Sequence, residues 1–368
     1  MTAMPAGAAT PFVPPTLRAG AKGRILSGMR PTGKLHQGNW VGALQNWVGL
    51  QEEYENFHMV AHWHALTTGS EDTGALQENT YEMVLDWLAA GIDPAKSPVF
   101  VQSHVKEHAE LHLLFSMLVT KARLERNPTL KDQVRDLQME ESSISYGHLG
   151  YACLQAADIL LYRANVVPVG EDQVPHIEIT REIARRFNHL YARDRPVFPE
   201  PEARLTKFPR LRGLDGNRMS KSVGNVILLS DSPEQILARV KTAYTDPKKI
   251  RKDDPGDPSG CSVFEYHRLF NPEGAPEIDR LCRAGQLGCV DDKKHLAAIM
   301  AEHLAPFRER REVLARDKDH VWDVLREGAK RARAEARSTM ERVRQAMNLV
   351  DPRGGGNDAP GFGDGRGL

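Results

Sequence analysis

The sequence has little of what would place the chain in a membrane or in an oxidising compartment. It contains no run of about 18 or more apolar residues, so it predicts no helix that crosses a membrane. The 368 residues include only 4 cysteines, and these show no paired framework, which suits a reducing compartment. We therefore expect a cytoplasmic protein with neither disulfides nor a membrane span.

An excess of either charge is also missing, because 49 basic residues balance 49 acidic ones. This balance argues against a polybasic, histone-like protein, although a basic surface for nucleic acid can still be local. Residues 1–20 are rich in proline, contain no acidic residue and lack the apolar core of a signal peptide. We expect them to form a disordered extension, and residues 349–368, rich in glycine and aspartate, to form a disordered tail.

Apolar runs and amphipathic segments alternate between residues 21 and 230. This alternation predicts an α/β fold with a Rossmann-type, doubly wound parallel sheet and a helical insertion. The expected strands are Arg24–Gly28, Phe57–Leu66, Val99–Ser103 and Val166–Gly170, and the expected helices are Gln77–Ala90, Leu111–Leu124, Tyr151–Tyr162 and Pro175–Leu190.

The pattern changes near Ser232, which is followed by Pro233 and so forms a good helix start. From there to Met347 the chain is charged and helix-forming, without strand signals. We expect a second, all-helical domain at residues 231–348.

A first candidate motif runs from Pro31 through Asn39 and reads Pro-Thr-Gly-Lys-Leu-His-Gln-Gly-Asn. Its glycines lack a Cβ atom, so the backbone can approach a nucleotide closely. A helix that starts near Gly38 would point free amide groups at a phosphate, and His36 can donate a hydrogen bond to it. Taken alone, the run also fits a glycine-containing turn with a surface histidine.

A second candidate motif, Arg-Met-Ser-Lys-Ser at residues 218–222, places Arg218 and Lys221 on a loop between glycines. Two such cations could neutralise the charge that grows on a departing pyrophosphate. The alternative is a solvated basic turn, which the presence of the first motif makes less attractive.

In this order, the two motifs resemble the nucleotide-binding signatures of class I aminoacyl-tRNA synthetases. Four further segments are similar to the bacterial tryptophanyl-tRNA synthetase family, and the resemblance extends from Arg24 to Met347. These segments are residues 42–47, 151–162, 167–173 and 180–188.

The resemblance implies a reaction with ATP and Mg²⁺ and assigns catalytic roles to Lys221, Arg218 and His36. It implies ATP contacts by Arg30, Pro31, Thr32, Gly38, Asn39, Gly170, Glu171, Asp172, Leu211, Arg218, Met219, Ser220, Lys221 and Ser222.

The resemblance also makes Asp158 the acceptor of the tryptophan indole N–H. An indole nitrogen only donates, so a pocket that selects it needs a polar acceptor. Tyr151 and Gln155 precede Asp158 on one helical face and should line the same pocket, together with His64. The alternative for Asp158 is a structural salt bridge, which its apolar neighbours weaken.

Some positions depart from the family pattern. Arg30 stands where many relatives have glutamine, and Thr129 where some relatives use glutamine near the substrate carboxylate. His62 replaces an aspartate, and the resemblance assigns it no role.

Cys261, Cys282 and Cys289 have nearly the spacing of an iron–sulfur site found in a subset of this family, but Asp292 holds the fourth position. Three thiolates do not normally complete such a cluster. We therefore expect no cluster, and apart from the Mg²⁺ that accompanies ATP we expect no metal ion held by protein residues.

The function implied by the resemblance is tryptophan–tRNA ligase, acting as a homodimer on L-tryptophan and tRNA(Trp), with neither DNA nor a membrane as partner. The helical domain should recognise the anticodon, and its C-terminal arginines could supply phosphate contacts. These are Arg331, Arg333, Arg337, Arg342 and Arg344. For most of them individually, a solvated, salt-bridged helix face is the better interpretation. Two alternatives stay open: a tyrosyl-tRNA synthetase, and a synthetase-like binding or regulatory protein without catalysis.

Overall fold

The computed structural model describes residues 12, 14–136, 140–205 and 211–350. Most of the expected N-terminal extension and nearly all of the expected tail therefore lie outside the described residues. Among the described residues no helix is both long and apolar enough to span a membrane.

A five-stranded parallel sheet forms the centre of the N-terminal half, with the order β3-β2-β1-β4-β5. This order confirms the predicted doubly wound fold, because the chain adds strands first on one side of β1 and then on the other. Ligands bind such sheets where the order reverses, here at the carboxyl ends of β1 and β4. The strands are β1 Arg24–Met29, β2 Glu55–Val60, β3 Val99–Val101, β4 Val166–Val169 and β5 Glu202–Leu205.

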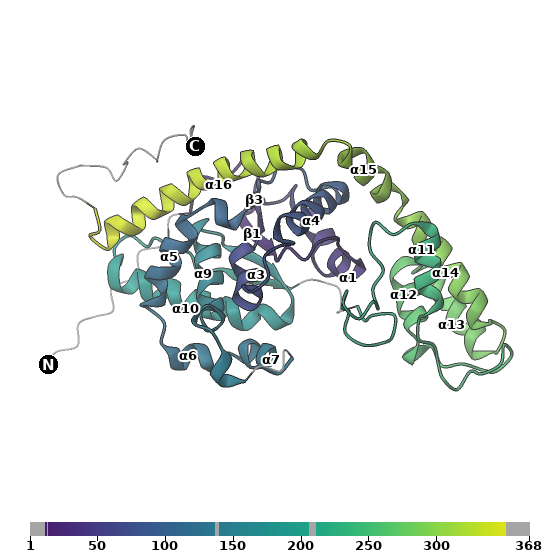
Figure 1. Ribbon diagram of the computed structural model, residues 1–368. Coiled ribbons are helices and arrows are strands. Elements are labelled where there is room, and N and C mark those ends of the chain that lie inside the picture. The colour runs from purple at the N-terminus through teal and green to yellow at the C-terminus, as the bar shows by residue number, and fades with distance from the viewer. Residues whose placement is uncertain (1–11, 13, 137–139, 206–210, 351–368) are drawn as a thin grey trace.

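Helices cover both faces of the sheet (Figure 1). The first helix begins at His36 and continues through α1 (Gln37–Asn39), one π-helical turn (Trp40–Leu44) and α2 (Gln45–Leu50). The others before residue 231 are α3 His62–Gly69, α4 Leu76–Ala90, α5 Glu107–Ser116, α6 Lys121–Glu125, α7 Pro128–Asp136, α8 Tyr146–Leu149, α9 Tyr151–Leu161 and α10 Val174–Tyr191.

Three expectations about elements were wrong in detail. The second strand ends at Val60, and the apolar run beyond it belongs to α3. The first turn of α3 is held in place because the Gln102 side chain accepts the Trp63 N–H at 2.9 Å. The helix expected over residues 111–124 is split, because Thr120 adopts an extended backbone and caps α6. Strand β5 was not predicted, since its residues are only half buried.

All the main elements after residue 231 are helices, as predicted, and Ser232 and Gln235 form a capping box at the first of them. They are α11 Pro233–Lys241, α12 Ser262–Phe270, α13 Ala275–Arg283, α14 Cys289–His303, α15 Ala305–Ala315 and α16 Lys318–Ala346.

The longest helix, α16, returns from the helical region and runs along the sheet-containing half (yellow in Figure 1). It packs against β3, α4 and α5. At Gly328 the approach is so close that an added Cβ atom would lie 1.9 Å from the Val99 carbonyl oxygen. The all-helical sequence after residue 231 thus covers the sheet as well as forming a separate cluster of helices.

This packing decides where the C-terminal arginines point. Arg331 donates to the Pro94 carbonyl at 2.6 Å and Arg333 to that of His104 at 2.5 Å. Arg344 donates to Glu110 at 2.8 Å, and Arg337 lies 3.6 Å from a Glu107 carboxylate oxygen. These four side chains therefore hold α16 to the sheet-containing half, which argues against the expected phosphate contacts.

Candidate active site

A cavity of about 610 Å³ opens where the strand order reverses, at the carboxyl ends of β1 and β4. Of the predicted tryptophan contacts, it is lined by Tyr151, Gln155, Asp158 and His64. Of the predicted ATP contacts, it is lined by Arg30, Gly170, Asp172 and Arg218, and Thr129 joins them. The structure therefore brings residues from six separate elements or loops to one place.

Asp158 lies on α9, lines this cavity and is only 2% exposed. Its carboxylate accepts hydrogen bonds from three side chains: His108 Nδ1 at 2.6 Å, His64 Nε2 at 2.7 Å, and Gln102 Nε2 at 2.8 and 2.9 Å to the two oxygens. Burial alone would raise the pKa of Asp158, but His108 and His64 outweigh it and lower the pKa to about 2. The buried side chain is thus an ionised acceptor.

Gln102 and His108, two of these three donors, were missed by the sequence analysis. His108 is completely buried and also contacts the Tyr162 hydroxyl through Nε2, at 2.8 Å. One signal could have found Gln102, because it follows β3 directly, and polar residues after a buried parallel strand face the ligand edge of the sheet. His108 lies in the first turn of α5, where no such signal marks it.

Gln155 and Tyr151 lie about one and two turns before Asp158 on the same face of α9. The rings of Tyr151 and His64 meet edge to face with their centres 4.4 Å apart. Gln155 Oε1 is 2.7 Å from His176 Nδ1, a contact that fixes the orientation of its amide. The aromatic and amide groups therefore form a fixed wall beside the carboxylate.

Of the three departures from the family pattern, Arg30 lines the cavity, and the other two have different positions. Thr129 lines the cavity and donates to the Asp172 carbonyl at 2.9 Å. His62 is not part of the cavity wall; its ring bridges Ser103 at 3.0 Å and Thr80 at 2.8 Å. His62 thus connects α3 to α4 and to the end of β3.

His36 is the N-cap of the first helix, and its Nδ1 accepts the Gly38 N–H at 3.1 Å. Burial, aided by the charge of Lys221, lowers the pKa of His36 to about 4. The ring is therefore neutral at pH 7, and because Nδ1 accepts, Nε2 carries the proton and can donate it to a ligand.

The two sequence motifs touch each other. Lys221 Nζ donates to the Thr32 carbonyl at 2.6 Å, and a Cβ atom at Gly38 would lie 2.6 Å from the Met219 sulfur. Burial lowers the pKa of Lys221. The remaining predicted ATP contacts do not line the cavity itself: Pro31, Thr32, Gly38, Asn39, Glu171, Leu211, Met219, Ser220, Lys221 and Ser222.

Far from this cavity, Cys261, Cys282 and Cys289 line a small pocket together with Asp292. Burial raises the pKa of the Cys261 and Cys282 thiols, whereas metal ligation needs thiolates. Asp292 is already engaged, since its carboxylate accepts from His267 Nε2 at 2.9 Å. This set of donors does not fit a four-iron cluster.

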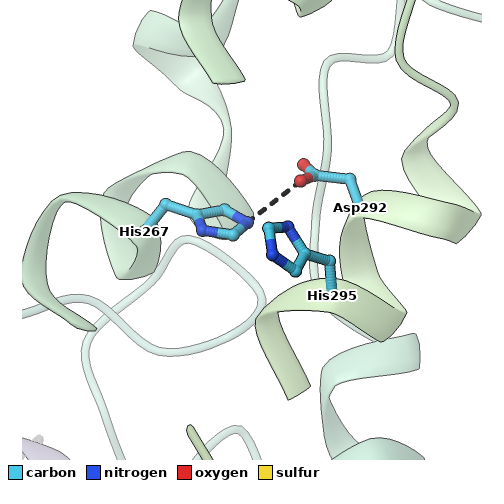
Figure 2. A group of neighbouring side chains, drawn as sticks. All are labelled: His267, Asp292 and His295. Carbon is cyan, nitrogen blue, oxygen red and sulfur yellow. Dashed lines mark hydrogen bonds and ion pairs between the residues drawn. The ribbon is translucent and has the colours of Figure 1, made fainter. Parts of the chain in front are cut away.

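His267, Asp292 and His295 also place their potential ligand atoms within 4.8 Å of one another (Figure 2). The hydrogen bonds oppose a metal ion there. Asn271 Nδ2 lies 3.4 Å from His267 Nδ1, and the Asn271 amide is oriented because its oxygen accepts the Gly274 N–H. The His267 proton is therefore on Nε2, the nitrogen that faces Asp292 and that a metal ion would need.

Comparison with known proteins agrees with this geometry. The family model described as class I tRNA synthetases, W and Y, matches residues 18–305. The chain belongs to this family. It is 53% identical over 330 residues to the tryptophan–tRNA ligase of Thermotoga maritima, covering 89% of this chain and 99% of the relative. Identity to the enzyme of Aquifex aeolicus is 44% over 396 residues, covering 89% and 100%.

Solved structures of this synthetase family have the same fold as this chain. Tryptophanyl-tRNA synthetase from Campylobacter jejuni, complexed with ADP and tryptophan, has a TM-score of 0.78 at 33% identity and covers 89% of this chain and 100% of its own. A tyrosyl-tRNA synthetase from Archaeoglobus fulgidus shares the fold, with a TM-score of 0.61 at 21% identity over 78% and 90% of the two chains.

Proposed function

We propose that this synthetase is a tryptophan–tRNA ligase, which activates L-tryptophan with ATP and transfers it to tRNA(Trp). The observation that carries the proposal is the ionised, buried Asp158 in the lining of a cavity that has an aromatic wall. An indole N–H needs such an acceptor, and a site built to hydrogen-bond its substrate rejects an analogue without the donor by about 10⁴–10⁵. Phenylalanine is such an analogue.

In this proposal the indole reaches Asp158 from the cavity side. Of the three donors to Asp158, His64 alone lines the cavity, while Gln102 and His108 hold the carboxylate from behind. When the indole N–H binds, His64 therefore either shares the Asp158 carboxylate oxygen with it or loses its own hydrogen bond to Asp158. Tyr151 and Gln155 border the rest of the amino acid.

ATP binds where the first helix begins. His36 donates through Nε2, the positive end of the helix attracts the phosphates, and Mg²⁺ accompanies them. A tryptophan carboxylate oxygen attacks the α-phosphorus, the bond to the bridging oxygen breaks, and pyrophosphate leaves. Lys221 and Arg218 stabilise the charge that develops on it. A ribose hydroxyl of the tRNA terminal adenosine then attacks the adenylate carbonyl, and AMP leaves.

Amino-acid-dependent ATP–pyrophosphate exchange with each of the twenty amino acids tests the function. We expect exchange with tryptophan alone. Exchange with tyrosine would support the tyrosyl-tRNA synthetase alternative, and no exchange with any amino acid would support a binding protein without catalysis.

For the helical part, residues 231–348, we propose recognition of the tRNA anticodon. Because α16 covers β3, deleting this part would uncover the sheet, so the cleaner test changes the tRNA. A tRNA(Trp) with an altered anticodon should lose charging by the intact protein while tryptophan activation is unchanged. Undiminished charging would refute the assignment.

We further propose a cytoplasmic homodimer that meets through the helices near the tryptophan pocket. Leu113 and Met117, at α5 and its end, are 56% and 67% exposed, which leaves apolar surface for a partner. Sedimentation at micromolar concentration checks the dimer, and a single species of 41.1 kDa would contradict it.

A further inference from the structure

One hydrogen bond links the first motif to the interior of α4. Asp86 is completely buried, and its Oδ2 accepts the Leu35 backbone N–H at 2.6 Å. Leu35 is also completely buried and directly precedes His36, the N-cap of the first helix. The backbone position of His36 therefore depends on where the Asp86 carboxylate is held.

Asp86 is in turn held from the C-terminal helices. Arg311 on α15 donates from Nε to Asp86 Oδ1 at 2.6 Å, and its guanidinium also pairs with Glu82. Burial raises the pKa of Asp86, and Arg311 is the main influence in the opposite direction. Without this cation a buried carboxylate would have to take up a proton or move, and either change weakens the bond to Leu35.

The same loop is bound on its other side by the chain that follows the second motif. The Leu35 carbonyl accepts the Leu229 N–H at 2.9 Å, and the Gln37 N–H donates to the Ile227 carbonyl at 3.2 Å. Leu35 thus lies between Asp86 and the segment after Lys221. A shift of its amide is passed to His36 and to the start of the helix at which ATP is proposed to bind.

We propose that Arg311 is a positioning residue for ATP: through Asp86 and the Leu35 amide it fixes the N-terminal turn of the first helix and His36. This inference rests on the proposed ATP reaction. The inference adds a chain of two hydrogen bonds, from Arg311 on α15 to Asp86 and from the Leu35 amide to Asp86, which connects the C-terminal helices to the nucleotide site.

The test compares two neighbouring arginines. Arg311→Met removes the cation at Asp86, whereas Arg310→Met, the control, removes only a donor to the Ala89 carbonyl near the end of α4. We expect Arg311→Met to lower kcat/KM for ATP in pyrophosphate exchange by on the order of tenfold to a hundredfold, since small displacements of catalytic groups have effects of this size. Tryptophan binding without ATP, measured by fluorescence, should not change, and Arg310→Met should leave both quantities unchanged.

Asp86→Asn separates positioning from general loss of stability. Asparagine still accepts the Leu35 N–H and, being neutral, does not need a cation. The double variant Arg311→Met/Asp86→Asn should therefore recover part of the ATP parameter that Arg311→Met loses. The proposal is overturned if the double variant is worse than Arg311→Met, or if ATP and tryptophan parameters fall together.

Hydrogen exchange of the Leu35 amide tests the link without reference to activity. Arg311→Met should speed this exchange and Arg310→Met should not, and equal exchange in the two variants would refute the link. If the unaltered protein shows no ATP–pyrophosphate exchange, the proposed function is refuted. The hydrogen-exchange comparison at Leu35 would still test the link between Arg311 and Leu35, because it does not depend on activity.

Discussion

At the scale of single residues, the main feature is a carboxylate that remains charged although it is buried. Asp158 is stabilised by donors from three different segments, His64, Gln102 and His108, none of which is its neighbour in sequence. Such a fully hydrogen-bonded charge costs far less than an unpaired one, and it is held in a fixed direction.

Asp158→Asn should lower kcat/KM for tryptophan by on the order of tenfold to a hundredfold, because a hydrogen bond to a charged group contributes about 1.5–3 kcal/mol. The amide keeps the shape of the side chain, so KM for ATP should stay the same. Steady-state pyrophosphate exchange measures both quantities. Undiminished tryptophan activation would show that Asp158 is not the indole acceptor.

Asp158 also predicts a pH dependence of stability. Its pKa is lowered from 3.8 to about 2 in the folded protein, so its contribution is present above pH 3.8 and lost as the pH falls through about 2. This shift corresponds to about 2 kcal/mol. The difference in unfolding free energy between the unaltered protein and Asp158→Asn, from urea titrations, should shrink across this window. A constant difference would mean that the pKa is not lowered.

Lys221→Ala should reduce the rate of adenylate formation by on the order of 10²–10³ while tryptophan affinity is kept. The ammonium now donates to the Thr32 carbonyl, and the proposal moves it to pyrophosphate only as charge develops there. Single-turnover kinetics gives the rate, and fluorescence titration gives the affinity. Equal losses in both would indicate a structural role.

At the scale of elements, the close approach of α16 to β3 depends on one position without a side chain. Gly328 lies in the middle of α16, where alanine would normally favour the helix by about 1 kcal/mol. Here the added methyl group would overlap the Val99 carbonyl, and the helix would have to move away from the sheet.

Gly328→Ala should therefore destabilise the protein by about 2 kcal/mol, the typical cost of overpacking. Gly49→Ala in α2 is the matched control, because no atom lies within 4 Å of the Cβ position there. The control should be neutral or slightly stabilising in thermal and urea unfolding. Similar effects of both substitutions would mean that α16 does not pack closely on β3.

At the scale of the whole molecule, the C-terminal helices serve two parts of the structure. Helices α11–α14 form the cluster that holds the cysteines, while α15 and α16 return to α4 and the sheet (Figure 1). The cysteine-lined pocket therefore lies among these helices and shares no lining residue with the cavity that holds Asp158.

The purified protein should contain no stable iron–sulfur cluster, because its fourth position is an aspartate already bonded to His267. Anaerobic purification followed by a visible spectrum and iron analysis checks this expectation. Asp292→Cys supplies the missing thiolate and is the matched variant in which cluster binding could return. A brown unaltered protein with about four irons per chain would overturn the assignment.

The sequence predicted most of the fold and part of the site. The alternating pattern gave the sheet and most of its helices, and the resemblance indicated Asp158, Tyr151, Gln155 and His64, which the structure brings to one cavity. It did not predict β5, whose residues are too exposed to show a strand pattern. The break between α5 and α6 was also missed, because a single cap at Thr120 decides it.

By itself, the sequence determined the fold class and the family and predicted the chemistry of the two motifs, because these depend on local patterns and on residue types at fixed spacing. Only the tertiary structure decided which groups support that chemistry. His108 and Gln102 meet Asp158 across 50 and 56 positions, and Arg311 meets Asp86 across 225. Contacts over such separations leave no periodic signal in the sequence, since they arise only when packed helices bring the side chains together.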